Sequence, residues 1–415
     1  MSSEPAAAPQ PVPGPAPRAP HPLGIPHFRN LWLGATISLL GDQFYLVALP
    51  WLALQLTGSS VVLGTLLMVA GIPRAAFMLI GGAVIDRFSA RRVLMLTAAV
   101  RMVLVGAVAA LVWRNRIQMW ELYGLTLAFG IADAFSFPAG PALIPTLVQP
   151  EQLPSANALM QSSTVMAQMA GPAPAGLAIK SWGVASALFF DALSFLAVIP
   201  VLLRIPDPPK APAHAHASML HSIAEGLRAV RRDPPLLALM SLFATINLCF
   251  SGPVGVGLAA LSKFRFGSAA AFGTLLSCFS GGMLLGMLLG ARIRRPRKRG
   301  LQFCVMSLLA GLELIAIGLV LKLAAIAALL ALIGLGVGFV NVQFSAWIQL
   351  RVERALLGRV MSVLMIAAVG LIPVSYAIAG VVAEWSLPAL FIGAGAILAA
   401  ASAVALTGRA AREID

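Results

Sequence analysis

The chain is poor in charge, and above all in acidic residues. Of its 415 residues, 15 are Asp or Glu against 29 Lys or Arg, and charged residues make up only 11% of the total. Soluble globular domains carry about 25% charged residues. So low a share excludes an ordinary soluble domain.

Cysteine and histidine are also scarce. The three cysteines lie within or at the edge of apolar segments and are expected to be packed as small side chains: Cys249, Cys278 and Cys304. Three of the five histidines, His214, His216 and His221, are close together, but no acidic or thiol ligand accompanies them. A solvated linker is the first interpretation of this segment and a metal site the second. We therefore expect no metal and no cofactor.

Sequence motifs for several kinds of chemistry are missing. There is no G-x-x-x-x-G-K-[ST] loop for ATP, which disfavours a primary pump unless a partner supplies the ATPase. Neither H-E-x-x-H nor G-x-S-x-G occurs, and all five histidines fall in predicted soluble segments. A membrane-embedded enzyme is disfavoured in consequence, and we expect that the protein is not an enzyme.

Apolar residues are what the chain has in abundance: 59% are hydrophobic and the mean hydropathy is +0.91. Segments of about 20 apolar residues, enough to span a bilayer of about 30 Å, recur throughout. Twelve are predicted, at 30–56, 60–85, 92–113, 118–147, 153–180, 183–204, 234–262, 268–291, 300–321, 323–347, 357–383 and 386–408. The predicted fold class is an all-α membrane protein with twelve transmembrane helices in two six-helix bundles.

The net charge of +14 could indicate nucleic acid, but the basic residues follow alternating loops rather than one face. With the N-terminus in the cytoplasm, the inner loops hold most of them, among them Arg87, Arg91, Arg92, Arg204, Arg228, Arg231, Arg232, Arg292, Arg351 and Arg359. This follows the positive-inside rule and places both termini in the cytoplasm. We expect a monomeric, multi-pass protein of the inner membrane. Its expected partner is the lipid bilayer, and no nucleic acid is expected to bind.

Composition shifts divide the chain into five parts. Residues 1–27 alternate proline with alanine, which predicts a disordered cytoplasmic tail. The N-terminal bundle is expected over 28–204 and the C-terminal bundle over 234–408. Between them, 205–233 is predicted to be a cytoplasmic linker with an amphipathic segment, and 409–415 a cytoplasmic tail.

Short motifs in fixed order carry a family resemblance along nearly the whole chain. Gly82-x-x-x-Asp86-Arg87 followed by Arg91-Arg92 resembles the loop between helices 2 and 3 of the major facilitator superfamily. Gly41-Asp42, Leu49-Pro50-Trp51, Asp191-Ala192-Leu193-Ser194-Phe195 and Gly358-Arg359-Val360 extend the likeness to the macrolide-efflux and enterobactin-exporter type. The loop departs from the superfamily pattern at Ser89-Ala90. The resemblance implies a secondary transporter that works by alternating access.

Six charged residues lie inside predicted spans and away from the span ends: Asp42, Arg74, Arg101, Asp133, Asp191 and Glu313. Such groups are costly in a bilayer and by default mark a polar pathway or a buried pair. In the resembled fold, helices 1, 4, 7 and 10 line the cavity, which favours Asp42 and Asp133 as proton-coupling residues. Arg101, Asp191 and Glu313 are interpreted as packing or pairing residues, and Arg101 is placed to pair with Asp133.

The predicted gate is Gly82, Asp86, Arg87, Arg91, Arg92 and Arg359. A carboxylate at a helix C-terminus faces the negative end of the macrodipole, a mismatch of about 0.3–1 kcal/mol, so Asp86 needs another partner. The resemblance implies that Asp86 meets Arg359 and the helix beginning at Gly358, and so closes the cytoplasmic side. A purely topological role of the arginines remains the alternative.

The predicted substrate-binding set is Phe44, Asn247, Asn341, Gln343 and Trp347. Polar groups at membrane depth seek protein or water, so the amide side chains are expected to face a cavity, where aromatic rings can stack on an amphiphilic substrate. Packing of the aromatic residues in the core is the alternative. Hinges are predicted where glycine and proline interrupt helices, at Gly171, Pro172, Gly176, Pro373 and Gly380, with a simple packing kink as the alternative.

These observations predict a secondary active transporter that exports a small amphiphilic compound, of drug, macrolide or siderophore type, in exchange for protons. An importer or metabolite transporter of the same fold, or a non-transporting membrane sensor, remains open. The sequence does not identify the substrate, because a pocket in this fold is built by side chains from several helices.

Overall fold

Long apolar segments make this an all-helical protein. The computed structural model describes residues 21–207, 219–293, 298–352 and 354–408, though not the side chains of 78–87, 219–224, 226, 354, 355, 357, 362 and 368, and these ranges contain no strand. The first group of helices is α1 (Pro26–Thr57), α2 (Ser60–Arg87), α3 (Ala90–Trp113), α4 (Met119–Leu143), α5 (Leu153–Ala170), α6 (Pro172–Trp182) and α7 (Val184–Arg204). Outside the described part lie the tails 1–20 and 409–415 and the residues His214 and His216. The side chains of His221, Asp86 and Arg87 and the surroundings of Gly82 are likewise outside it.

The second group repeats the plan. It comprises α9 (Pro234–Gly252), α10 (Leu258–Phe264), α11 (Ala269–Arg292), α12 (Arg299–Leu319), α13 (Leu323–Arg351), α14 (Arg354–Val369), α15 (Ile372–Trp385) and α16 (Leu387–Thr407). A π-helical turn, Pro253–Gly257, joins α9 to α10. The amphipathic α8 (Met219–Arg232) lies between the two groups in the chain and packs on α14 and α9.

Local chemistry sets several helix ends. Gly58 ends α1 in the left-handed conformation, at φ 64°, which glycine adopts without a steric cost. The hydroxyl of Ser89 accepts a hydrogen bond from the amide of Arg92 and so caps the start of α3. Asp233 caps α9 in the same way through Leu236. Each cap gives a partner to a backbone amide that has none within its helix.

Eleven segments of the described chain are long and apolar enough to cross a membrane. The pair α5 and α6 is not among them, since the chain breaks at Gly171 between the two helices. Together they run over 153–182, or about 45 Å at 1.5 Å per residue, which is long enough for one more crossing. The membrane class is confirmed, and the count of twelve stays a prediction.

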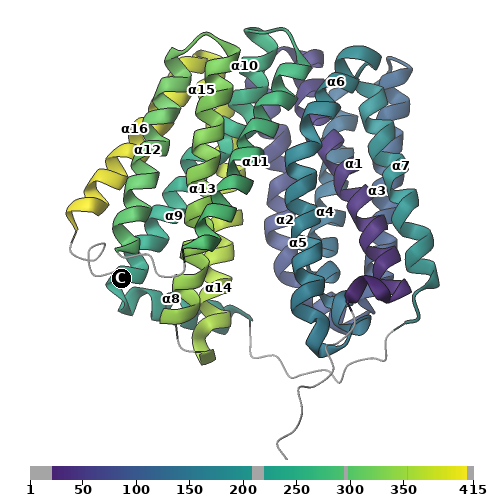
Figure 1. The fold of residues 1–415 in the computed structure, drawn as a ribbon. Helices are drawn as coiled ribbons and strands as arrows, with labels where there is room; N and C mark the ends of the chain where they lie inside the picture. The colour runs from purple at the N-terminus through teal and green to yellow at the C-terminus, as the bar shows by residue number, and fades with distance from the viewer. Residues whose placement is uncertain (1–20, 208–218, 294–297, 353, 409–415) are drawn as a thin grey trace, which may run out of the picture.

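The two groups of helices stand side by side (Figure 1). Helices α1 to α7 form one half, and α9 to α16 the other, with α8 at the lower side of the view, where α1 begins. We call this side the α8 end. The opposite side, where Gly58 and Ser386 turn the chain, is called the Gly58 end.

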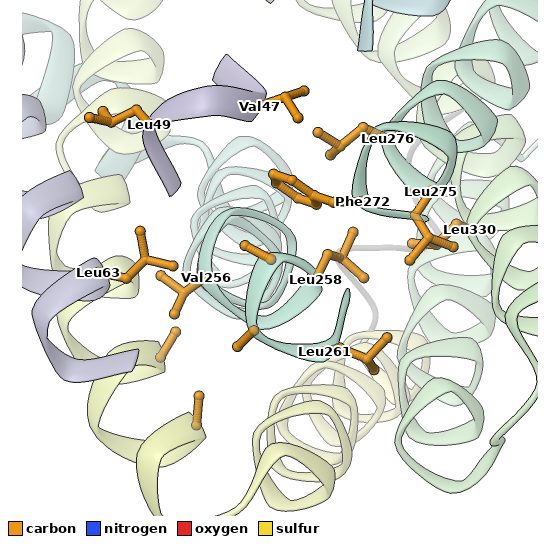
Figure 2. Packing of buried hydrophobic residues seen from close by; sticks show 14 of the residues in the cluster. Val47, Leu49, Leu63, Val256, Leu258, Leu261, Phe272, Leu275, Leu276 and Leu330 are labelled. Carbon is orange, nitrogen blue, oxygen red and sulfur yellow. The ribbon is translucent and has the colours of Figure 1, made fainter. Parts of the chain in front are cut away.

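The halves meet through an apolar junction near the Gly58 end. Val47 of α1 faces Leu276 and Phe272 of α11, and Leu63 of α2 faces Val256 before α10 (Figure 2). These five side chains are at most 8% exposed. At about 1.5–3 kcal/mol for each large apolar side chain fully buried, the junction is a strong contact between the halves.

Candidate functional site

Most of the ionisable residues inside the helices gather at one place in the N-terminal half. Asp42, Arg74, Arg101, Asp133 and Asp191 come from α1, α2, α3, α4 and α7, and we call them the charged cluster. Asp42, Arg74 and Arg101 each stand near the middle of their helices. Five separate helices therefore bring charge to one level of the bundle.

Arg101 is the centre of this cluster. Its guanidinium makes an ion pair with the Asp42 carboxylate, and its Nη1 lies 3.8 Å from Oδ1 of Asp133. The same group sits over the rings of Phe129 and Phe195, at 4.6 and 4.9 Å. Because the Arg101 side chain is only 11% exposed, these contacts replace the water that a guanidinium loses on burial.

Asp133 is held from a second side as well. Nε of Arg74 lies 3.1 Å from its Oδ2, while half of the Arg74 side chain is exposed. Thus the two predicted proton-coupling residues, Asp42 and Asp133, share one arginine. Their titration during transport stays a prediction. Arg101 was expected to be a packing or pairing residue close to Asp133, and its contact with Asp42 was not expected.

Asp191 differs from the other two carboxylates. Its side chain is fully buried, and neither oxygen has a hydrogen-bond partner. A Cβ placed on Gly41 would lie 3.0 Å from Asp191 Oδ1, so α1 and α7 are in close contact at Gly41, the residue before Asp42. The sequence analysis interpreted Asp191 as a packing or pairing residue, and among the described residues it is packed without an ion pair.

An apolar pocket lies inside the C-terminal half. It holds about 300 Å³ of space, and we call it the aromatic pocket. Its walls come from α9, α11, α12 and α13 and include Phe243, Phe250, Phe279, Phe303, Phe344, Met306, Val337, Asn247, Ser251, Ser307 and Asn341. Phe344 stacks on both Phe243 and Phe303, with ring centroids 5.4 Å apart in each pair. The lining contains no charged side chain, so the pocket suits an uncharged, ring-bearing group.

Two of the five predicted substrate-binding residues line this pocket, Asn247 and Asn341. The amide of Asn247 donates to Phe243 O in its own helix, at 2.9 Å. Gln343 and Trp347 lie outside it, and the Gln343 amide instead donates to Gly290 O at 2.7 Å, tying α13 to the end of α11. Phe44 packs on Phe190 of α7, in the other half.

Four of the five predicted hinge residues lie where the halves touch, and the fifth, Gly171, lies against Gln43 of α1 in its own half. A Cβ on Gly380 would be 2.8 Å from Ser60 O and 3.1 Å from Gly64 Cα, so α15 and α2 are in backbone contact. On the other side, a Cβ on Gly176 of α6 would lie 2.5 Å from Ala269 O of α11. Pro172 and Pro373 each stand in the first turn after a helix break. These residues pack helices closely, and their bending stays a prediction.

Glu384 adds a polar contact at this junction. Its carboxylate, at the end of α15, accepts hydrogen bonds from the amides of Ser60 at 2.5 Å and Val61 at 3.3 Å, and from the Ser59 hydroxyl at 3.1 Å. The first amides of α2 have no partner within the helix, and they favour a negative charge. Glu384 was missed by the sequence analysis because its partner lies more than 300 residues away.

At the α8 end, the described gate residues bind other partners than the one predicted. Arg91 and Arg92 pair with Asp207 at 3.2 and 2.7 Å, and Arg359 pairs with Glu225 of α8 at 2.8 Å. Hydrogen bonds from Ser89 and then from the two arginines lower the pKa of Asp207 below its usual range. Gly82, Asp86 and Arg87 lie outside the described side chains, so the contact between Asp86 and Arg359 stays a prediction.

The chain is similar to known proteins in sequence and in fold. Residues 31–373 match the family model described as Major Facilitator Superfamily. Macrolide efflux protein A of Streptococcus pyogenes is 26% identical over 341 residues, covering 81% of this chain and 84% of that protein. Multidrug efflux pump Tap of Mycobacterium bovis (strain BCG / Pasteur 1173P2) is 27% identical over 399 residues, covering 93% and 94%.

Solved structures with the same fold are more distant in sequence. A POT family transporter in complex with 5-aminolevulinic acid superposes with a TM-score of 0.71 at 14% identity, covering 93% of this chain and 95% of that one. A bacterial homologue of the iron transporter ferroportin in an inward-facing state gives 0.70 at 16% identity, covering 92% and 98%. At these identities the likeness extends to the fold alone.

Proposed function

The chain belongs to the Major Facilitator Superfamily, and on that premise we propose that it exports a small amphiphilic compound in exchange for protons, by alternating access. The family and the names of its relatives indicate a transporter in a membrane and not an enzyme. Two relatives over most of the chain are named efflux proteins. Substrate, proton coupling and mechanism are the proposed part.

The observation that carries the proposal is the separation of two sites. The aromatic pocket of the C-terminal half has no charged lining residue, whereas the charged cluster lies wholly in the N-terminal half. An apolar pocket with amide and hydroxyl groups suits the ring or hydrocarbon part of an amphiphile. Carboxylates that share one arginine are the groups that can exchange a proton when their surroundings change. Each site is thus suited to one half of an antiport reaction.

We propose that the Gly58 end faces outward and the α8 end faces the cytoplasm. The basic residues Arg91, Arg92, Arg228, Arg231, Arg232, Arg351 and Arg359 belong to the α8 side, as the positive-inside rule requires. In that orientation the contacts of α2 with α15 and of α6 with α11 close the outward side. The state described is then one that opens toward the cytoplasm, from which an exporter takes its substrate. Both termini and the linker 205–233 lie on the cytoplasmic side in this proposal.

The break between α5 and α6 fits this arrangement. We propose that the two helices make one interrupted crossing, which brings the total to twelve and lies against α1 and α11. In many transporters, discontinuous helices at the junction of two repeats form the substrate and ion sites. Each half then has six crossings, with the bundles at 28–204 and 234–408.

Cells test the function directly. In a strain lacking its main efflux systems, production of the protein should raise the inhibitory concentration of erythromycin or ethidium and lower cellular ethidium. Collapse of the proton gradient should abolish both effects. A matched strain producing the Arg101→Met variant is the control for expression of an inactive chain. Unchanged susceptibility and accumulation with both probes, at confirmed membrane expression, would count against export of such compounds.

Filling the aromatic pocket should impair transport. Gly336 of α13 lines it, and a Cβ there meets only Met306 Sδ, at 3.8 Å, so a larger side chain has room to enter. Gly336→Phe is expected to lower ethidium export at least about tenfold, the loss that about 1.4 kcal/mol of binding energy produces. Export is measured as initial efflux from preloaded cells.

Gly393→Phe is the matched control for this variant. A Cβ on Gly393 of α16 meets no atom within 4 Å, and Gly393 does not line the pocket. It should keep normal export. Equal export by the two variants would show that the aromatic pocket is not where the probe binds.

A further inference from the structure

Asp191 is the carboxyl of the charged cluster that has no counter-charge in contact. It lies on α7, is fully buried, and neither of its oxygens accepts a hydrogen bond. An ionised carboxylate without partners is not tolerated in an apolar interior, and such a group binds a proton instead. Asp42 and Asp133, in contrast, each have an arginine in contact.

The charges around Asp191 can be followed helix by helix. α1 brings Asp42 and the phenol of Tyr45, and α3 brings Arg101. α6 also packs on α7, and its one charged residue is the exposed Lys180. Asp133 and Arg74 complete the cluster behind Arg101. Thus one guanidinium, already bound to two carboxylates, is the positive charge nearest to Asp191.

The charge of the whole cluster leads to the same result. Three carboxylates and two arginines, Arg74 and Arg101, carry a net charge of −1 when all are ionised. A single added proton makes the cluster neutral, which a bilayer interior favours. Because Asp42 and Asp133 are stabilised as anions by their arginines, the third carboxyl is where that proton is bound.

A second buried group is positioned to respond when the proton leaves. Nε of Arg101 is buried without a hydrogen-bond partner, and the guanidinium lies over Phe195, one turn after Asp191 on α7. An ionised Asp191 would attract this N–H and compete with Asp42 and Asp133 for Arg101. The cluster therefore has two alternative pairings, selected by one proton.

We propose that Asp191 carries the coupled proton of transport, and that its loss moves Arg101 toward α7. This proposal rests on the proposed exporter function. The proton binds to the Asp191 carboxylate while the Gly58 end is open to the outside. It is released to cytoplasmic water after the α8 end opens. Because Asp191 has no exposed surface, it exchanges its proton by way of Asp42, whose side chain is 27% exposed. One proton enters the cell in each cycle, and no bond other than O–H forms or breaks.

Infrared spectroscopy of the purified protein in lipid vesicles tests the protonation without a substrate. The wild type should show the C=O stretch of a protonated, non-hydrogen-bonded carboxyl, and aspartate isotope labelling should shift it. Asp191→Asn should lose this band. Glu313→Gln is the matched control, since Glu313 is a carboxyl inside a span that lies outside the charged cluster, on α12 in the opposite half, and it should retain the band.

Thermal unfolding gives a second readout. Asparagine has nearly the shape of a protonated aspartate, so Asp191→Asn should leave Tm unchanged, whereas Asp42→Asn loses an ion pair and should lower Tm. Should Asp191→Asn fail to fold, the infrared spectrum of the aspartate-labelled wild type still tests whether a protonated aspartate is present. An aspartate band supports the proposal, and its absence at all pH values overturns it.

Transport separates this proposal from the function on which it rests. In proteoliposomes, Asp191→Asn should retain ethidium exchange between two equal pools but lose uptake driven by a pH gradient, at least about tenfold. Wild-type protein without gradient-driven uptake would refute the proposed proton antiport itself. Gradient-driven wild-type uptake that Asp191→Asn retains, or a band that persists in that variant, would overturn the role of Asp191 alone.

Discussion

Replacing Arg101 with methionine is expected to abolish export and to destabilise the N-terminal half. Removing the guanidinium leaves Asp42 and Asp133 without the counter-charge that they share, in a largely buried place. Breaking a fully buried pair costs about 3–5 kcal/mol. The loss here should be smaller, because the two carboxylates keep 27% and 20% of their side-chain surface exposed. Thermal unfolding in detergent and ethidium efflux measure the two effects.

Two further variants show whether the effect is specific to the Arg101 guanidinium. Arg114→Met removes an exposed arginine at the end of the same helix and should change neither Tm nor efflux. Arg101→Lys keeps the charge but has no planar fork with which to bridge two carboxylates, so we expect intermediate stability and little transport. Full transport by Arg101→Met would show that the charged cluster has no part in the cycle.

Gly380→Val should lock the protein with its Gly58 end open. The added side chain would meet Ser60 O and Gly64 Cα, both backbone atoms that cannot turn aside, so α2 and α15 would have to separate. Transport should fall to background. Spin labels at the exposed positions Trp182 and Trp385 should report a longer distance than in the parent protein, with the three native cysteines replaced beforehand.

Gly393→Val is again the matched control, because its new side chain meets nothing within 4 Å. It should leave both the label distance and transport unchanged. If Gly380→Val kept the parent distance distribution together with full transport, the contact between α2 and α15 would not be a closure of the transport path.

The helices could be predicted from sequence because hydrophobic length is a local property. The expected span 300–321 appears as Arg299–Leu319, and 183–204 as Val184–Arg204. The linker's amphipathic segment appears as α8. Glycine and proline likewise identified the interruptions at Gly171 and before Pro373, where the structure shows close helix packing and where bending stays a prediction.

The sites were harder to predict, because partners come from distant parts of the chain. Burial cost singled out six charged residues, the family resemblance then favoured Asp42 and Asp133 among them, and the helix levels suggested that Arg101 reaches Asp133. Nothing local distinguishes Asp191, which has no partner, from a residue in a buried pair. Gln343 has the polarity of a cavity residue, yet it satisfies Gly290 O, and that need arises only once α11 and α13 are packed.

Flux in proteoliposomes tests proton-driven export most directly. Vesicles containing the purified protein are made acidic inside, and ethidium uptake is compared with that of protein-free vesicles and of Arg101→Met vesicles. Ethidium is a permanent cation, so it does not accumulate by pH partition alone. Ethidium uptake should run against a concentration gradient and should stop when the pH gradient is collapsed. Uptake of ethidium and of erythromycin no greater than in protein-free vesicles, or equal with and without the pH gradient, would contradict it.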